Sequence, residues 1–261
     1  MASEPILHLS QEGPLATVRL NRPDVRNAFN AELVARLRET FESLASDGSV
    51  RAIVLSGEGK TFCGGADISW MRGSLDLSYD DNVADARAMS ELFRCIDRCP
   101  KPVIGRIHGA ALGGGAGLAA VCDIVIAGSE TVFGFTEVKL GIIPAVISPF
   151  VLAKIGVTHA RALFFTGERF DAKRAFHIGL VHEVVVADTL DVCIERVADE
   201  IMSAGPNAVG AAKALIPLVA ASSYDDSREL TAQAIAKQRT SPEGQEGLRA
   251  FLERRKANWI A

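Results

Sequence analysis

Residues 108–118 read HGAALGGGAGL, and residues 62–68 read FCGGADI. Each glycine-rich stretch follows a short apolar run, at 103–107 for the first and at 52–56 for the second. Glycine lets the backbone turn tightly and approach a ligand closely, so free N–H groups from both loops can converge on one atom. Two such donors form an oxyanion hole, which stabilises the negative charge that develops on a carbonyl oxygen.

A single carboxylate follows the glycine-rich stretch at 108–118. The segment FGFTEVKLGIIP, residues 133–144, places Glu137 at the start of a short amphipathic turn. Neither glycine loop supplies a Ser, Cys or Lys beside a base, so the chemistry indicated is polarisation of a carbonyl without a covalent intermediate. A carbonyl-polarising pair and one carboxylate suffice for proton transfer at the carbon next to that carbonyl.

Composition limits the classes of protein to which the chain can belong. It has 261 residues, of which 48% are hydrophobic, and a formal net charge of -4 at pH 7. This length fits one large domain, or a domain with an appendage, with a sizeable core. The negative charge argues against general binding to nucleic acids or anionic membranes. A basic cluster near the end could hold a phosphorylated ligand or form a solvated helix face; it comprises Arg249, Arg254, Arg255 and Lys256.

Cysteines and apolar runs indicate the compartment. Five cysteines without a C-x-x-C motif indicate neither a zinc site nor a disulfide framework, and we expect no metal. The first residues, MASEPILHLSQEG, lack the charged start and long apolar run of a signal peptide, and no apolar run reaches the length of a membrane span. We therefore expect a cytoplasmic protein with no membrane partner.

Strands alternate with helices in the first half of the chain. A hairpin is predicted from residues 6–9 and 15–20, and Asn30 is predicted to cap a helix that ends near residue 46. Further strands are predicted at 52–56, 103–107 and 124–127, and a polar, mobile stretch at 73–84 before a helix that ends near 98. The later half is predicted to be mostly helical, with helix caps at Thr158, Asp171 and Asp188. This order indicates an α/β core with a C-terminal helical extension.

Three familiar motifs occur only in part. Gly59-Lys60-Thr61 lacks the leading glycine of a phosphate-binding loop, since that position is Val54 inside a predicted strand. The run Gly115-x-Gly117-x-x-Ala120 fits a dinucleotide fingerprint formally, but it does not directly follow a strand. His108-Gly109 resembles the oxyanion stretch of lipases, yet the chain has no G-x-S-x-G motif. A nucleotide-binding protein and a serine hydrolase are therefore disfavoured.

Motifs along nearly the whole chain resemble those of one family. They are NRP at 21–23 with NA at 27–28, FCGGADI, KPVIGRIHGAALGGG, CDI at 122–124, FTEVKLGIIP, FTGE at 165–168, GLVHEVV at 179–185 and FLERRKANW at 251–259. The chain thereby resembles the crotonase, or enoyl-CoA hydratase/isomerase, superfamily. The resemblance implies a crotonase spiral of ββα units over residues 1–200 and a C-terminal helical trimerisation region over 201–261. It also implies a homotrimer, or a hexamer made of two trimers.

The same resemblance implies roles for individual residues. The backbone N–H groups of Ala66 and Gly114 would form the oxyanion hole for an acyl-CoA thioester, and Glu137 would be the catalytic acid/base. Residues that would bind the substrate are Asp24, Val25, Arg26 and Ile68 in the CoA channel, Gly117 and Pro144 in the site, and Phe251 and Arg254 from a neighbouring subunit. Coenzyme A would enter as part of the substrate, with no further cofactor.

One departure from the family pattern bears on mechanism. Typical hydratases of the family carry a second catalytic glutamate where this chain has Gly117, and no acid lies between Leu112 and Val121. A glutamate at position 117 is expected to project into the cavity that holds Glu137. Residues 142–152, IIPAVISPFVL, also differ from the glycine-rich segment of many relatives. With this segment the chain most resembles bacterial 3-methylglutaconyl-CoA hydratases.

Three functions are compatible with these residues. The first is hydration of a 2-enoyl-CoA, in particular interconversion of 3-methylglutaconyl-CoA and 3-hydroxy-3-methylglutaryl-CoA in leucine degradation. The second is double-bond isomerisation, because isomerases of the family use one glutamate at the position of Glu137. The third is a catalytically weakened CoA-binding scaffold, against which the retention of Glu137 argues.

Four other polar or reactive residues are interpreted as structural. Asp67 and Asp123 are expected to fix loops through hydrogen bonds. His108 is expected to be a satisfied histidine at the buried end of a strand, and Cys63, which has no histidine partner in the sequence pattern, a small packing residue.

Overall fold

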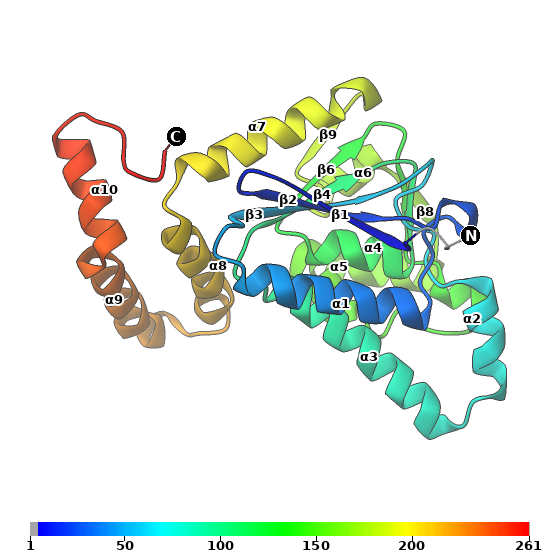
Figure 1. The fold of residues 1–261 in the computed structure, drawn as a ribbon. Coiled ribbons are helices and arrows are strands. Elements are labelled where there is room, and N and C mark those ends of the chain that lie inside the picture. Colours follow the sequence, from blue (N-terminus) through cyan, green and yellow to red (C-terminus); the bar gives the residue numbers. More distant parts are fainter. Residues whose placement is uncertain (1–4, 261) are drawn as a thin grey trace.

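A six-stranded sheet organises the computed structural model, which describes residues 5–260 (Figure 1). Its order is β1 (Leu7–Glu12), β2 (Leu15–Leu20), β3 (Ala52–Gly57), β4 (Val103–Ile107), β6 (Ile124–Gly128) and β9 (Glu183–Val185). The β1–β2 hairpin is antiparallel, and each later strand pairs parallel to its neighbour. A second sheet contains β5 (Ala110–Leu112), β7 (Val132–Gly134) and β8 (Arg169–Asp171).

From β4 to β7 successive strands alternate between the two sheets, and the chain forms the predicted spiral of ββα units. Between β4 and β5 only His108 and Gly109 change the chain direction. Gly109 has a φ of 64°, and a Cβ atom at this position would lie 1.9 Å from the carbonyl oxygen of Lys60. No other residue fits this corner without moving Lys60, which leads into the FCGGADI loop.

Helices cover both faces of the large sheet (Figure 1). The main core lies on one face, under α1 (Ala31–Ser46), α3 (Tyr79–Asp97), α4 (Gly114–Val121) and α5 (Ser148–Thr166). On the other face α7 (Leu190–Ser203) packs on Val54, Ile104 and Ile126. Alternation along β3 sends Ile53 and Leu55 to the first core and Val54 to the second. Within the described residues, every helix is too short or too polar to cross a bilayer.

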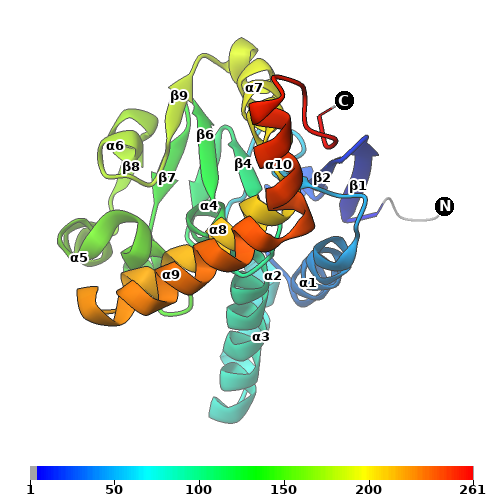
Figure 2. The same cartoon turned by 90° about the vertical axis from the view of Figure 1, so that its left-hand side faces the viewer.

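Three helices form a C-terminal module to one side of this body (Figures 1 and 2). They are α8 (Pro206–Ala220), α9 (Tyr224–Thr240) and α10 (Pro242–Leu252). Arg51 holds the module by donating hydrogen bonds to the carbonyl oxygens of Ala204 and Trp259. Helix α7 runs through residue 200, so the chain leaves the body only after Ser203.

Several predicted elements are confirmed at their boundaries. The Asn30 side chain accepts a hydrogen bond from the Leu33 amide at 2.9 Å and caps α1. Asp171 caps α6 (Ala172–His177) in the same way, with 2.7 Å to the Arg174 amide. The hairpin and the strands at 52–56, 103–107 and 124–127 are also present, within a few residues of the predicted bounds.

Other predictions about the helices are wrong. Asp188 lies in a short 3-10 helix, and α7 begins after Thr189. Thr158 lies inside α5, just after a break at Gly156, so it does not cap the start of this helix. The predicted helix starts earlier than expected, because α3 begins at Tyr79, capped by Ser78, inside the stretch 73–84 in which α2 (Ile68–Gly73) ends. The mobility of this stretch stays a prediction. Strands β5, β7, β8 and β9 were not predicted, because three residues each give too short a pattern.

Candidate active site

The two glycine loops lie side by side at the end of the large sheet. The Cys63 amide donates to the carbonyl of Ala110 at 3.0 Å, and the Leu112 amide donates to the carbonyl of Cys63 at 3.1 Å. A Cβ atom on Gly115 would lie 2.3 Å from the Cys63 oxygen. The close approach therefore depends on glycine, and it fixes the two loops relative to each other.

The Ala66 amide is free to bind a ligand. Ala66 forms a parallel bridge with Phe29, in which the Phe29 amide donates to Gly65 and the Asp67 amide donates to Phe29, at 2.7 and 2.8 Å. Because neighbouring residues alternate in such a bridge, the N–H of Ala66 points away from Phe29. Within residues 5–260 this N–H donates to no backbone or side-chain acceptor.

The Gly114 amide has the same freedom for a different reason. Gly114 is the first residue of α4, and the first N–H groups of a helix have no acceptor within it. The preceding residue, Gly113, has a φ of 52°, and its amide donates to the Gly134 carbonyl at 2.8 Å. This turn directs the N-terminal end of α4, with its partial positive charge, toward the loop that carries Ala66.

Glu137 lies against the same turn. It begins a 3-10 helix (Glu137–Leu140), and a Cβ atom on Gly113 would lie 3.3 Å from its Oε1. Its Oε2 is buried and has no hydrogen-bond partner among the described residues. Burial raises the pKa of this carboxyl group, although its own backbone amide opposes the effect. A buried carboxyl oxygen without a partner, with a raised pKa, is suited to exchanging a proton with a bound ligand.

The side of α4 that carries Gly114 and Gly117 is apolar. A Cβ atom on Gly117 would lie 2.3 Å from Cγ2 of Ile147 and 3.3 Å from a ring carbon of Phe93. A Cβ atom on Gly114 would lie 3.0 Å from a ring carbon of Phe29. A glutamate at 117 therefore enters this space only if Ile147 moves, and its projection toward Glu137 stays a prediction. Contact of Gly117 with substrate stays a prediction.

The predicted CoA-channel residues surround the Ala66 loop. Asp24 and Val25 lie in an exposed 3-10 helix (Pro23–Val25), and Arg26 follows with a φ of 57°. The Arg26 carbonyl accepts from the Gly64 amide at 2.8 Å, which ties this segment to the loop. Ile68 is 73% exposed at the start of α2. Pro144 is buried in the segment that follows Glu137.

Phe251 and Arg254 are not part of this cluster within one subunit. They lie at the end of the C-terminal module, which Figure 1 shows on the opposite side of the molecule from α2. Phe251 is 81% exposed. In the basic cluster, Arg255 forms ion pairs with Glu246 and Glu253, each at 2.7 Å, so its charge is balanced within the chain.

The residues interpreted as structural have structural partners. Asp67 forms an ion pair with Arg22 at 2.7 Å and caps α2, and the hydrogen bond from Arg22 lowers the pKa of Asp67. Asp123 accepts from Lys213 at 2.6 Å and from the Val103 amide at 2.7 Å. Burial raises the pKa of the Cys63 thiol to about 12, which excludes a reactive thiolate near neutral pH.

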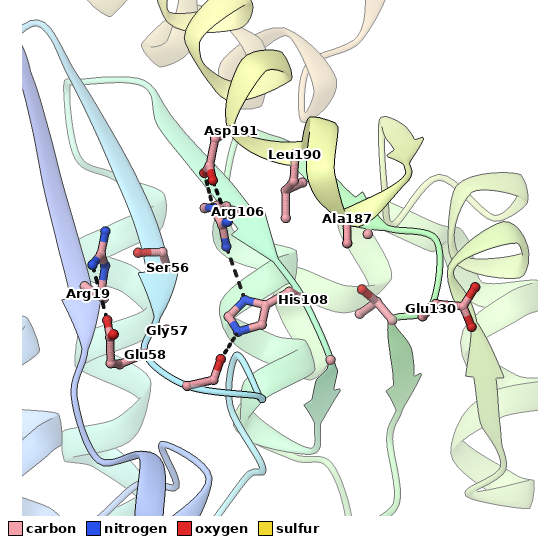
Figure 3. Close-up of a pocket in the computed structure, with 14 residues that line it drawn as sticks. Arg19, Ser56, Gly57, Glu58, Arg106, His108, Glu130, Ala187, Leu190 and Asp191 are labelled. Atoms are coloured by element: carbon pink, nitrogen blue, oxygen red, sulfur yellow. Dashed lines mark hydrogen bonds and ion pairs between the residues drawn. The ribbon is translucent and has the colours of Figure 1, made fainter.

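Sequence reasoning missed two cavities. One, of about 190 Å³, lies between α2 and α3 beside Ala66, and its lining includes Met71, Asn82, Asp85 and Met89. The Trp70 indole N–H donates to Asp85 at 3.2 Å. The second, polar cavity lies under His108 (Figure 3). The helical spacing of Asn82, Asp85 and Met89 could have indicated the first cavity, had 73–84 not been predicted to lie before the helix.

Similar proteins agree with this arrangement. The family described as Enoyl-CoA hydratase/isomerase matches residues 10–261. A crotonyl-CoA hydratase from Syntrophomonas wolfei is 35% identical over 263 residues, 100% of each chain. The short-chain-enoyl-CoA hydratase of Clostridium acetobutylicum is 33% identical, over 95% of each chain. The crystal structure of an enoyl-CoA hydratase from Shewanella pealeana superposes with a TM-score of 0.94 at 35% identity, covering 98% of this chain and 96% of the other.

These relatives span the whole spiral and the C-terminal module, and their names specify addition of water to a carbon–carbon double bond of a CoA thioester. That reaction needs a polarised thioester carbonyl and a proton donor at the α-carbon, which the arrangement around Ala66, Gly114 and Glu137 can supply. The chain belongs to the enoyl-CoA hydratase/isomerase family and is an enzyme of its carbon–oxygen lyase type.

Proposed function

We propose that Ala66 and Gly114 hold the thioester oxygen of a 2-enoyl-CoA while Glu137 gives its proton to the α-carbon. The observation that carries this proposal is the buried Oε2 of Glu137, which has no hydrogen-bond partner within residues 5–260 and belongs to a carboxyl group beside the turn that presents the Gly114 amide. Water attacks the β-carbon, the π electrons move onto the thioester oxygen, and the two amides stabilise the resulting enolate. Protonation of the α-carbon by Glu137 then completes the hydration.

The proton that the attacking water loses must return to Glu137. No second carboxylate is present on α4, and the space beside Gly117 is filled by Ile147 and Phe93. We therefore propose that a bound water carries this proton, and that a carboxylate on the substrate itself orders this water. A raised pKa favours this cycle, because Glu137 is more easily reprotonated than an ordinary glutamate.

A substrate with its own carboxylate leads to the finer proposal, 3-methylglutaconyl-CoA, which on hydration gives 3-hydroxy-3-methylglutaryl-CoA. The cavity beside Ala66 constrains how such a substrate binds. Asp85 lies in its wall, and none of its lining residues is Arg, Lys or His. Because like charges repel, the substrate carboxylate is directed away from this cavity in our proposal, toward the water near Glu137.

Double-bond isomerisation is the second candidate, and the same single carboxylate favours it. An isomerase moves one proton between two carbons of the acyl chain and needs no second acid. A weakened scaffold is disfavoured, since an unpaired buried carboxyl group destabilises the fold and has no use without chemistry.

We also propose that the chain assembles as a homotrimer or a hexamer. The support is the amount of apolar surface on the C-terminal module, where Ile216, Phe251 and Leu252 are 69%, 81% and 78% exposed. Helix α9 has no buried residue in the single chain. A large exposed apolar surface of this kind is typical of a subunit interface.

A panel of three thioesters tests the function: 3-methylglutaconyl-CoA, crotonyl-CoA and a 3-enoyl-CoA. We expect kcat/KM for the branched diacid to exceed that for crotonyl-CoA by about tenfold or more, roughly 1.4 kcal/mol in the barrier. Better hydration of crotonyl-CoA would overturn the finer proposal but leave the hydratase. Conversion of the 3-enoyl-CoA alone would establish the isomerase, and binding of all three without conversion would establish the scaffold.

A further inference from the structure

The turn that leads into the Ala66 loop is held by side chains from outside it. Residues 58–61 connect β3 to the loop, and Gly59 in this turn has a φ of 76°. Asn27 donates from its amide nitrogen to the carbonyls of Glu58 and Thr61, at 2.9 and 2.7 Å. The Gly59 carbonyl lies at 2.9 Å from Nε2 of His108. Each of these carbonyls is therefore fixed by one polar side chain.

His108 makes a second contact with the same loop through its backbone. The Phe62 amide, at the start of FCGGADI, donates to the His108 carbonyl at 3.0 Å. Gly109, the next residue, packs directly against the Lys60 carbonyl. His108 thus holds the turn at Gly59 and the loop at Phe62 together, four residues before Ala66.

The surroundings of His108 select one form of its ring. A carbonyl only accepts hydrogen bonds, so Nε2 carries the proton that is donated to Gly59. Arg106 only donates, so its NH1, 3.4 Å from Nδ1, requires a lone pair there. Arg106 is in turn held by two hydrogen bonds to Asp191 at the start of α7 (Figure 3). These contacts together require a neutral imidazole with the proton on Nε2.

Electrostatics agree with this form. Burial lowers the pKa of His108, and the nearby positive charge of Arg106 lowers it further, against the hydrogen bond to Gly59. The His108 side chain faces the polar cavity of about 380 Å³ in Figure 3. Besides Arg106 and Asp191, the charged residues that line this cavity are Arg19, Glu58 and Glu130. Arg19 and Glu58 are paired with each other at 3.2 Å.

From these contacts we infer that His108 is a positioning residue for the oxyanion hole: its neutral Nε2–H fixes the Gly59 turn and thereby the position of the Ala66 amide. The inference rests on the proposed role of Ala66. It differs from an ordinary core histidine because its side-chain bond ends on Gly59, in the turn that leads into the loop that presents the catalytic donor. Loss of that bond should therefore reduce carbonyl polarisation, with little effect on CoA binding.

The test compares His108→Gln with His108→Asn. The amide nitrogen of Gln reaches about the position of Nε2, whereas that of Asn reaches only about the position of Nδ1, so only Gln can renew the bond to Gly59. Ser56→Ala is the matched control, because Ser56 lies in the same cavity, is 2% exposed, and has no partner for its hydroxyl among the described residues.

Two readouts separate positioning from folding. One is kcat and KM for crotonyl-CoA; the other is the red shift in absorbance of a chromophoric cinnamoyl-CoA thioester on binding, which reports polarisation of its carbonyl. We expect His108→Asn to lose about tenfold in kcat with KM nearly unchanged, and to show a smaller red shift, because small misplacement of a catalytic donor is costly. His108→Gln and Ser56→Ala should remain close to wild type in both readouts.

The outcomes distinguish this inference from the proposed function. If wild type itself gives no red shift, the oxyanion role of the loop is wrong and the inference falls with it. If wild type gives the shift and the Asn variant equals the Gln variant in shift and kcat, the inference alone is overturned. If Asn loses activity only through a raised KM, His108 acts on binding and the inference is again overturned.

Discussion

The two sides of the first turn of α4 differ sharply in polarity. On one side, Gly113 faces the carboxyl group of Glu137, whose Oε2 is buried without a partner in the described chain. On the other side, Gly117 faces the side chains of Ile147 and Phe93. Ile147 is 3% exposed and Phe93 is fully buried, so this second side is closed by hydrocarbon.

This difference indicates where the enzyme exchanges protons. A buried carboxyl oxygen without a hydrogen bond costs about 1–3 kcal/mol or more, so it persists where a ligand completes it. The apolar side has no such group, and its close packing leaves no room for one. We therefore expect all proton exchange between protein and acyl group to occur on the Glu137 side.

The strongest test of this contrast is Glu137→Gln. The amide keeps the size of the side chain but cannot transfer the proton, so kcat should fall roughly 10² to 10⁴-fold. Steady-state kinetics on the best thioester measure the loss, and a direct binding assay with the same thioester checks that affinity is retained. Wild-type turnover in this variant would show that another group is the acid/base.

The next test removes the amide donor of Gly114, which follows Gly113 at the start of α4. Gly114→Pro eliminates one N–H group and should cost about 3 kcal/mol of transition-state stabilisation. Proline is tolerated at the first position of a helix, but any side chain here approaches Phe29, since a Cβ atom would lie 3.0 Å from its ring. Gly114→Ala is the matched control, because it adds that Cβ atom and retains the N–H.

The informative quantity is therefore the difference in kcat between Gly114→Pro and Gly114→Ala. We expect the Ala variant to lose much less kcat than the Pro variant, with circular dichroism showing that both are folded. Equal losses in the two folded variants would mean that the contact with Phe29, and not the missing donor, causes the effect. The thioester oxygen would then be held elsewhere.

A third test concerns the apolar side. Gly117→Glu alone should destabilise the protein by about 1–3 kcal/mol, because its side chain must displace Ile147. The double variant Gly117→Glu/Ile147→Ala should recover part of that loss and bring a second carboxylate to the site. Urea denaturation compares both with Ile147→Ala alone. If Gly117→Glu is as stable as wild type, the packing of Ile147 does not exclude an acid there.

The sequence predicts the Glu137 side of the site much better than the other side. The glycine loops carry a local signal, since the positive φ of Gly113 and the short distance from Gly115 to Cys63 both require glycine. Both constraints are visible in the sequence as glycines, although Gly115 and Cys63 lie 52 residues apart. Glu137 could likewise be predicted from the order of the motifs along the chain, because its segment follows the glycine-rich stretch at 108–118.

The apolar side depends on contacts between distant segments. Ile147 reaches Gly117 only because the chain turns between Leu140 and α5, and no local pattern shows which glycine a side chain will cover. The same limit explains why the cavity beside Ala66 was missed, since its wall comes from α2 and α3. The contact between His108 and Gly59 spans 49 residues and was likewise invisible, although the satisfied state of His108 was expected.

The smallest effect expected from the contrast is a pH dependence of the free energy of unfolding that is caused by Glu137. Burial raises the pKa of this carboxyl group in the folded protein above its ordinary value of 4.5, so near that pH the folded state binds more protons than the unfolded state. The free energy of unfolding therefore falls as the pH rises through this window, and the charged group remains unfavourable above it. Glu137→Gln cannot titrate, so it should gain stability relative to wild type between pH 4 and pH 8, as measured by urea denaturation at both values. A constant difference between the two proteins would mean that the carboxyl group gains solvent or a partner in solution, and the contrast between the two sides of α4 would then lose its electrostatic basis.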